Sequence, residues 1–161
     1  MDEIHANYLR DHHGYETWRT PDDEGAPVVS GFTPGPEQMP GWQPVRVDPV
    51  PFEGARSATQ SIWRPVQGEG ALLRLDLIEV TSSGHARAML LRLLGEFQSP
   101  ELRRREGIGD VAFEMPGSSC ILFARRNVVV MLRNAGHEVV GLEAPARELD
   151  QALREAGREE N

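Results

Sequence analysis

The stretch GIGDVAFEMPGSSCILFARRNVVVML, residues 107–132, gives the clearest indication of the fold. Two apolar runs, 119–125 and 127–133, follow each other directly and meet at an Arg-Arg-Asn sequence. Consecutive positions along these runs are apolar, so each strand would present apolar side chains on both of its faces. Such a strand must be covered on both sides. We therefore expect a hairpin near the centre of a sheet.

Gly107, Gly109 and Asp110 begin this stretch and invite comparison with a nucleotide-binding loop. A dinucleotide-binding fingerprint needs a third glycine and leads from a strand into a helix, whereas these glycines lead into the strand VAFEMP. Glycine adopts positive φ at little cost, and an aspartate can accept hydrogen bonds from nearby backbone amides. The pattern therefore predicts a turn.

The same stretch resembles a pattern common in bacterial exported or lipoprotein-type domains of uncharacterised function. The shared features are Gly-x-Gly-Asp-x-Ala-Phe from Gly107, a short break, an apolar strand, and Arg-x-Asn from Arg125 followed by valines. The resemblance covers residues 107–132 only. It implies an α+β extracytoplasmic domain, usually without enzyme motifs, and it carries no functional residues over to this chain.

Two strands are predicted before this region. The run ALLRLDLIEV, residues 71–80, places three leucines on one face and Arg74 and Asp76 on the other, which is the pattern of a half-buried strand. The run at 57–66, which contains Trp63, alternates more weakly. A Gly-Glu-Gly turn separates the two runs, so we expect an antiparallel hairpin.

Two helices are predicted. In residues 83–98, apolar side chains recur every three or four positions and form one stripe, with Ser82 or Ser83 as the N-cap and Pro100 at the end. Pro145 lies at a first-turn position and begins the second helix. The order of an arm followed by β-β-α-β-β-β-α predicts an α+β fold: an antiparallel sheet of about five strands with two helices packed on it.

Residues 1–44 are predicted to form an extended arm, and residues 45–161 a single domain. Eight of the twelve prolines fall in residues 21–51, a density that neither a helix nor a central strand tolerates. Five of the ten aromatic residues also lie in the arm, whereas disordered segments are usually poor in them. An arm of this kind suggests a strap that docks on its own domain or on a neighbouring chain, and both alternatives stay open.

The composition excludes several classes of function. The formal net charge is −8, which argues against a general nucleic-acid-binding protein. All seventeen basic residues are arginine, so there is no lysine for a Schiff base, a P-loop or a Ser-Lys pair. A single cysteine, Cys120, excludes an intramolecular disulfide, and its place within an apolar strand favours a buried structural thiol.

The sequence does not decide the cellular compartment. No run approaches the ~20 apolar residues that a membrane-spanning helix needs, so we expect no membrane span. The first residues, MDEIHANYLRDHH, are acidic and contain no apolar core, so they do not read as a signal peptide. The chain is then either cytoplasmic or the mature form of an exported, periplasmic protein.

The histidines give at most a weak metal site, and no cofactor is expected. His5, His12 and His13 lie in the arm among acidic residues, and imidazole and carboxylate ligands suit zinc or nickel. Their spacing matches no closed site, and an extended arm preorganises ligands poorly. His85 and His137 are interpreted as surface residues.

The arginines give the stronger signal for a binding partner. Arg103, Arg104 and Arg105 precede the glycine turn, and Arg125 and Arg126 lie at the hairpin turn. Guanidinium groups bind carboxylates in bidentate fashion. Either these arginines pair with acids of their own chain, such as Glu101 and Glu106, or they receive an acidic surface of a protein partner or of a second copy.

The expected function is therefore that of a non-enzymatic binding or accessory domain. It would make protein–protein contacts, with a partner protein or with a second copy in a homo-oligomer, through the arm with Trp18 and Trp42 and through the arginines. The alternative is a carrier of a small apolar ligand, with a pocket between the sheet and the 83–98 helix. That pocket would be lined by Leu90, Leu94, Phe97, Phe113 and Phe123. An enzyme ranks third, because no spacing predicts a catalytic group.

Overall fold

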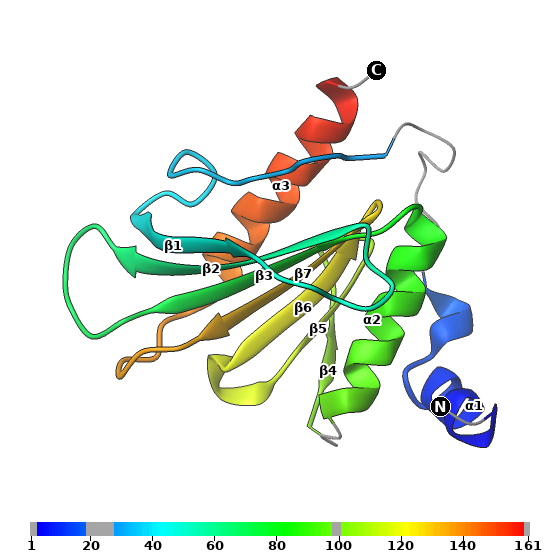
Figure 1. Cartoon of the computed structure of the whole chain (residues 1–161). Helices are drawn as coiled ribbons and strands as arrows, with labels where there is room; N and C mark the ends of the chain where they lie inside the picture. The colour runs from blue at the N-terminus through cyan, green and yellow to red at the C-terminus, as the bar shows by residue number, and fades with distance from the viewer. Residues whose placement is uncertain (1–2, 19–27, 98–100, 160–161) are drawn as a thin grey trace.

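The computed structural model describes residues 3–18, 28–97 and 101–159. Within these ranges the elements are α1 (Glu3–His12), η1 (Tyr15–Thr17), β1 (Trp42–Pro49), β2 (Ser57–Pro65), β3 (Leu73–Glu79), α2 (Ser83–Phe97), β4 (Arg103–Arg105), β5 (Val111–Glu114), η2 (Pro116–Ser118), β6 (Cys120–Arg125), β7 (Val128–Asn134) and α3 (Glu143–Glu159). Figure 1 shows the sheet between α2 and α3.

All seven strands form one antiparallel sheet with the order β1-β2-β3-β7-β6-β5-β4. Helix α2 carries the chain from β3, in the middle of the sheet, to the far edge at β4. The next three strands then return as hairpins until β7 pairs with β3. The predicted α+β class and antiparallel sheet are confirmed, as is the central position of the β6–β7 hairpin. The predicted numbers of about five strands and two helices are too low.

Strand β1 was missed because it contains two prolines. It begins at Trp42, inside the segment that was expected to be extended arm, and it lies at an edge of the sheet. The backbone N–H of Val50 donates to the carbonyl of Ala58 at 3.0 Å. Along an antiparallel pair, successive residues point their backbone N–H and C=O groups alternately toward and away from the partner strand. Val50 points toward β2, so Pro49 points away from it. The backbone N–H that proline lacks would therefore have faced away from β2, and no hydrogen bond of the sheet is lost.

Strand β4 was missed because it consists of three arginines and shows no apolar alternation. It pairs only with β5, which places it at the opposite edge of the sheet. Short, charged edge strands protect a sheet from pairing with other chains. Edge position therefore explains why neither missed strand has the pattern of a buried one.

The expectation of a wholly extended arm is wrong for residues 3–12, which form helix α1. Glu3 lies in its first turn and Arg10 and His12 in its last, an arrangement that suits the helix dipole. Leu9 is buried against Gly95 of α2, where even a Cβ atom would come within 2.7 Å of Leu9 Cδ1. The absence of a side chain at Gly95 thus lets α1 dock on α2.

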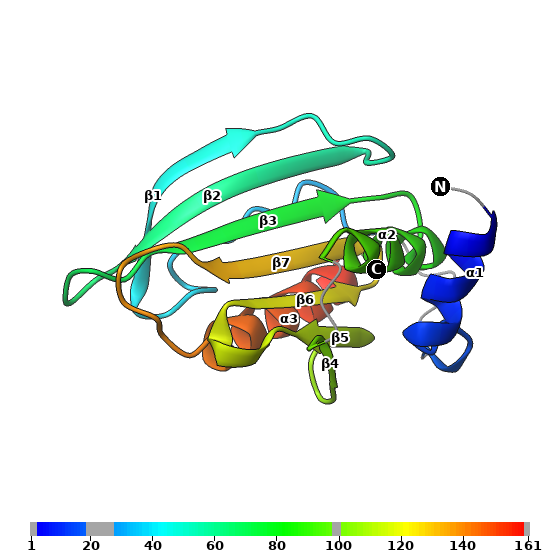
Figure 2. The same ribbon diagram turned by 90° about the horizontal axis from the view of Figure 1, so that it is seen from below.

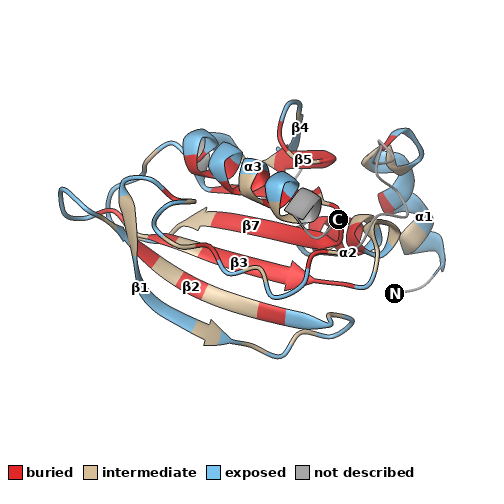
Figure 3. Ribbon diagram, turned by 90° about the horizontal axis from the view of Figure 1, so that it is seen from above, coloured by how far each residue is buried: buried red, intermediate tan, exposed pale blue. Residues whose placement is uncertain are grey.

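Both faces of the sheet are covered, as the apolar β6–β7 hairpin required. On one face, α2 and residues 3–18 pack over a first apolar cluster. On the other, α3 and the proline-rich segment 28–42 pack over a second cluster. Figure 3 shows β3 and β7 almost entirely buried, whereas β1 is largely exposed. The described parts of the arm therefore pack on the sheet of their own chain.

The boundaries of the strongly patterned elements agree closely with the prediction. Ser82 Oγ accepts a hydrogen bond from the backbone N–H of His85 at 3.1 Å and so caps α2. Helix α3 begins at Glu143, with Pro145 in its first turn. Pro100, expected to end the first of these helices, lies outside the described residues.

Candidate functional site

Of the three arginines in β4, two are bound within their own chain. Arg105 forms ion pairs with Glu114 of β5, at 3.2 Å, and with Glu143 at the start of α3. Arg104 donates to Thr17 Oγ1 at 3.0 Å, which ties β4 to the segment after α1. Arg103 is exposed. A role for these arginines in partner binding stays a prediction.

Arg125 and Asp110, from the stretch that opened the sequence analysis, form an internal network. Arg125 donates to both carboxylate oxygens of Asp150 on α3, at 2.6 and 3.1 Å, and to Asp110 at 3.0 Å. Asp110 also accepts from the backbone N–H of Arg126 at 2.8 Å. The glycine turn is as predicted, with Gly109 at φ +62° against the Ala124 carbonyl.

Asn127, which sequence reasoning passed over, is the most completely bonded side chain of this turn. Its Oδ1 accepts from the N–H of Val29 at 2.8 Å, and its Nδ2 donates to the carbonyls of Val29 and Val80, each at 2.9 Å. The side chain is buried. Asn127 therefore clamps the arm to the sheet, and a role of Arg125 and Arg126 in partner binding stays a prediction.

The two tryptophans proposed for partner binding lie on their own sheet. Trp18 is buried in the first cluster, donates from Nε1 to the His13 carbonyl at 2.9 Å and has its ring 5.7 Å from that of Phe113. Trp42 is half-buried and packs against the second cluster. A contact of either with another chain stays a prediction.

The histidines of the arm do not gather around a common point. The described residues contain no group of three or more His, Cys, Asp or Glu side chains placed to hold a metal ion. The ring of His13 instead meets that of Phe113 edge-on at 5.6 Å. Burial, and to a smaller extent the charge of His12, lower the pKa of His13 below 6.5.

The predicted lining of a pocket between the sheet and α2 is met only in part: Phe97 lines a cleft there, whereas the other predicted residues do not. Phe123 lies on the α3 face of the sheet, opposite α2, so it cannot line a pocket with Phe113. Leu90 and Leu94 are fully buried, and their side chains fill the space under the helix. The apolar stripe predicted for this helix is therefore part of the hydrophobic core.

An open cleft lies beside α2 instead. It has a volume of about 490 Å³. Its floor is formed by β2, β3 and β7, and its sides by the last turn of α2 and by the loop that leaves β1. Figure 2 shows the reason for its position: α2 lies over β7 and β6 and leaves β2 and β1 clear. The apolar lining consists chiefly of Val50, Phe52, Ile78, Leu93, Phe97 and Met131.

The floor of the cleft also carries charged side chains. Strand register places Arg74 of β3 beside Arg133 of β7, and Asp76 beside Gln60 of β2. Asp76 Oδ2 accepts from Arg74 Nε at 3.2 Å and from Arg133 Nη2 at 3.1 Å. The sequence assigned Arg74 and Asp76 to a solvent face, yet Asp76 is only 7% exposed.

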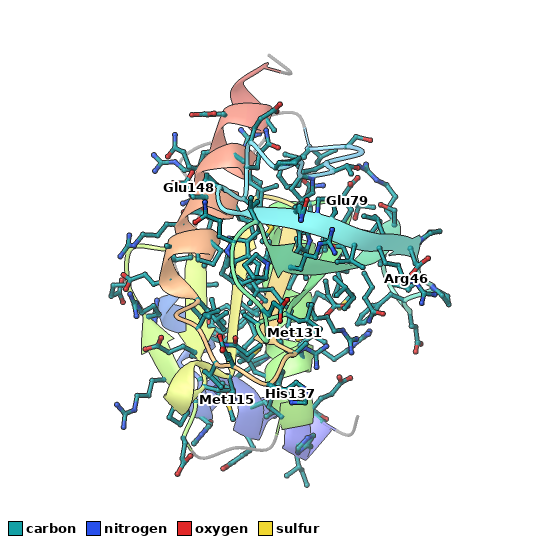
Figure 4. The ribbon with its side chains drawn as sticks, turned by 90° about the vertical axis from the view of Figure 1, so that its left-hand side faces the viewer. Arg46, Glu79, Met115, Met131, His137 and Glu148 are labelled. Atoms are coloured by element: carbon teal, nitrogen blue, oxygen red, sulfur yellow. The ribbon has the colours of Figure 1, made fainter. Side chains whose placement is uncertain are left out.

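Figure 4 places this cleft relative to the rest of the molecule. Met131, from the cleft floor, lies in the interior, whereas Arg46 of β1 and Glu148 of α3 lie on opposite sides of the molecule. A second hollow, of about 720 Å³, lies between the loops at 66–72 and 135–137, but it is lined mainly by exposed loop residues. The first cleft is the better candidate because strands and a helix build it.

Cys120 lies next to Arg133 in the sheet and is buried. Burial raises the pKa of its thiol to about 12, with a further contribution from Asp76, while the charge of Arg133 acts in the opposite direction. A thiol with this pKa is neutral at physiological pH and makes a poor nucleophile. The predicted structural role of Cys120 agrees with this environment.

Comparison of the chain with protein-family models, with curated proteins and with solved structures gave no match. In the described part of the chain, none of the helices has the length and apolar character needed to cross a membrane. The cleft is therefore interpreted from its own geometry and chemistry.

Proposed function

We propose that this protein is a non-enzymatic binding protein that holds a small amphipathic molecule in the cleft beside α2. The cleft itself carries the proposal. Its volume of about 490 Å³ falls within the range of ~300–1,000 Å³ that is usual for small-molecule sites. Mostly apolar walls with a few converging polar groups are also the usual composition of such sites.

The loop at 50–56 supports a preformed cleft. The guanidinium of Arg92 on α2 lies over the Phe52 ring, 5.2 Å from its centre, in a cation–π arrangement. Gly54 brings the same loop close to the side chains of Met89 and Arg92. Because these contacts anchor the loop on α2, a ligand would find one wall already in position, which lowers the entropy cost of binding.

The first measurement is native mass spectrometry of gently purified protein, read for a small molecule that stays bound. The cleft is then tested by calorimetric titration with 1-naphthaleneacetamide, a neutral amphipathic probe. Val50 lines the cleft from its loop, so Val50→Trp should fill the cleft and lower the affinity at least tenfold. Equal affinity in this variant, or no binding to the wild type, would contradict the proposal.

Val139→Trp is the matched control. Val139 is 63% exposed, lies before α3 and does not line the cleft. The same increase in size there should leave probe affinity unchanged. Melting temperatures of both variants, compared with that of the wild type, separate a filled cleft from a damaged fold.

A second candidate function is self-association through β1, which would provide the protein–protein contact expected from the sequence. Val45 and Val47 are 57% and 48% exposed, and the backbone of Val47 faces away from β2. If two β1 strands paired antiparallel about a two-fold axis at Val47, Arg46 of each copy would lie opposite Asp48 of the other. The two edges would then place opposite charges next to each other. Val47→Pro would remove the outward donor and should convert a dimer to a monomer in native mass spectra.

A further inference from the structure

Two guanidinium groups share one carboxylate on the cleft floor. Asp76 bonds to Arg74 and Arg133 through the same oxygen, Oδ2. The Asp76 side chain is 11% exposed, whereas those of Arg74 and Arg133 are 37% and 31% exposed. The two cations thus reach the open cleft while their shared anion lies beneath them, so the floor presents positive charge.

Neighbouring groups do not cancel this charge. Cys120, beside Arg133, is a neutral thiol. Gln60 is also uncharged. When its amide oxygen faces Arg74, this oxygen accepts a hydrogen bond from Arg74 Nε at 2.8 Å. Glu96 is the other acid of the lining, and it lies exposed on the last turn of α2, where water and salt screen it.

The hydrogen-bonding capacity of Arg133 is incompletely used. Its Nε is buried and has no hydrogen-bond partner within the described part of the chain. A guanidinium carries five N–H donors in a planar fork, which matches a carboxylate in bidentate fashion. A ligand carboxylate in the cleft would accept from the exposed part of this guanidinium, since the Arg133 side chain is 31% exposed.

We propose that the ligand of the cleft carries a carboxylate on an apolar body, and that Arg74 and Arg133 receive this group. Asp76 is a positioning residue, because it holds the two guanidinium groups side by side and offsets their mutual repulsion. The apolar body lies along Phe52, Phe97 and Met131. This inference rests on the proposed function and adds the chemical class of the ligand.

Two isosteric pairs of probes test the inference by calorimetry on the full chain. The aromatic pair is 1-naphthaleneacetate and 1-naphthaleneacetamide, and the aliphatic pair is decanoate and decanamide. In at least one pair the carboxylate should bind at least tenfold more tightly than the amide. Raising the salt concentration should reduce this preference, because part of it is electrostatic.

Arg133→Gln removes one cation from the floor and should reduce the preference to less than threefold, with amide affinity nearly unchanged. Arg74→Gln is the second variant, for the case that loss of Arg133 beside buried Asp76 prevents folding. Arg64→Gln is the matched control. Arg64 lies on β2, whose Gln60 belongs to the cleft floor, but Arg64 is exposed and outside the cleft.

The outcomes separate the two proposals. A carboxylate preference that is lost in Arg133→Gln or Arg74→Gln and kept in Arg64→Gln supports the inference. Equal binding of acid and amide, blocked by Val50→Trp, overturns the carboxylate inference and leaves the cleft as a binding site. A preference that survives both floor variants also overturns it. Absence of binding by all four probes overturns the proposed function, and the inference with it.

Discussion

Asn127 shows how much of this fold can depend on one residue. Its side-chain amide bonds to both backbone groups of Val29, which lies 98 residues earlier, and to the carbonyl of Val80. Val29 belongs to the proline-rich arm, where no strand ladder satisfies its backbone groups. A buried asparagine offers both a donor and an acceptor, so it replaces the ladder there.

Asn127→Ala should lower the free energy of unfolding by about 3 kcal/mol, because the buried N–H of Val29 and the carbonyl of Val80 lose their bond to Asn127. The Val29 carbonyl keeps its bond to Arg56. Urea denaturation followed by tryptophan fluorescence measures this loss. Asn134→Ala is a suitable control. Asn134 bonds to both backbone groups of Val140 in a similar way, but it is only partly buried, so its loss should be about 1 kcal/mol. Equal losses would show that burial does not determine the cost.

His13 makes stability depend on pH. Its pKa in the folded chain is lowered by burial and by His12, so the fold favours the neutral ring. The unfolded chain therefore binds more protons below pH 6.5, and the stability of the fold decreases as the pH falls through that value. His13→Phe keeps a ring against Phe113 without a titrating group. Its melting temperature should fall less than that of the wild type between pH 7 and pH 5; parallel curves would contradict this assignment.

At the scale of elements, α1 depends on a glycine inside another helix. Glycine lowers helix stability by about 1 kcal/mol relative to alanine, so Gly95 is an unfavourable choice for α2 alone. Its lack of a side chain allows Leu9 to pack closely against α2. The packing of α1 thus offsets a local cost in α2.

Gly95→Val should displace α1 and cost about 2 kcal/mol, the contribution of one buried leucine. Limited trypsin digestion should then cut after Arg10 faster than in the wild type. Ala88→Val, at an exposed position of the same helix, should change neither stability nor cleavage appreciably. Faster cleavage in both variants would mean that a general loosening of α2, and not the contact with Leu9, releases α1.

At the scale of the whole molecule, the arm supplies layers on both faces of the sheet. Residues 3–18 lie with α2, and residues 28–42 lie with α3. Val29 and Met39 are fully buried in the second cluster. Burial of a side chain of this size contributes about 1.5–3 kcal/mol, and a domain is stable by only about 5–15 kcal/mol in total.

Deletion of residues 1–41 should therefore abolish cooperative unfolding and the near-ultraviolet circular dichroism of the folded chain. Deletion of residues 1–18 removes Leu9, Trp18 and the partly buried Tyr15 from the first cluster and leaves the second intact, so a cooperative transition at a lower temperature should remain. If the longer deletion unfolds at the wild-type temperature, the arm is an accessory and not part of the fold.

Strong periodicity made several elements predictable. The leucines of β3 and the stripe of α2 each repeat with one period, and the β6–β7 hairpin is apolar on both faces, so the burial of all three follows from the local pattern. Strands β1 and β4 and helix α1 lack such a pattern, because edge strands and a small surface helix bury few side chains. Their positions depend on contacts with distant parts of the chain.

The candidate site was less predictable than the fold. The arginines that form clusters in the sequence, such as Arg105 and Arg125, are mostly bound to acids of their own chain. Arg74 and Arg133, which line the cleft, lie on different strands, β3 and β7, and the sequence does not predict that they meet. Only the register of the sheet brings them to one carboxylate.

The sequence by itself determined the α+β class, the central hairpin and the apolar faces of the main helices, because these follow from local periodicity and from the need to bury apolar surface. The tertiary structure decided which strands lie at the edges, where the arm docks and which arginines reach the cleft. These features arise from pairings between residues far apart in the chain, and the period of a local segment contains no information about its distant partner.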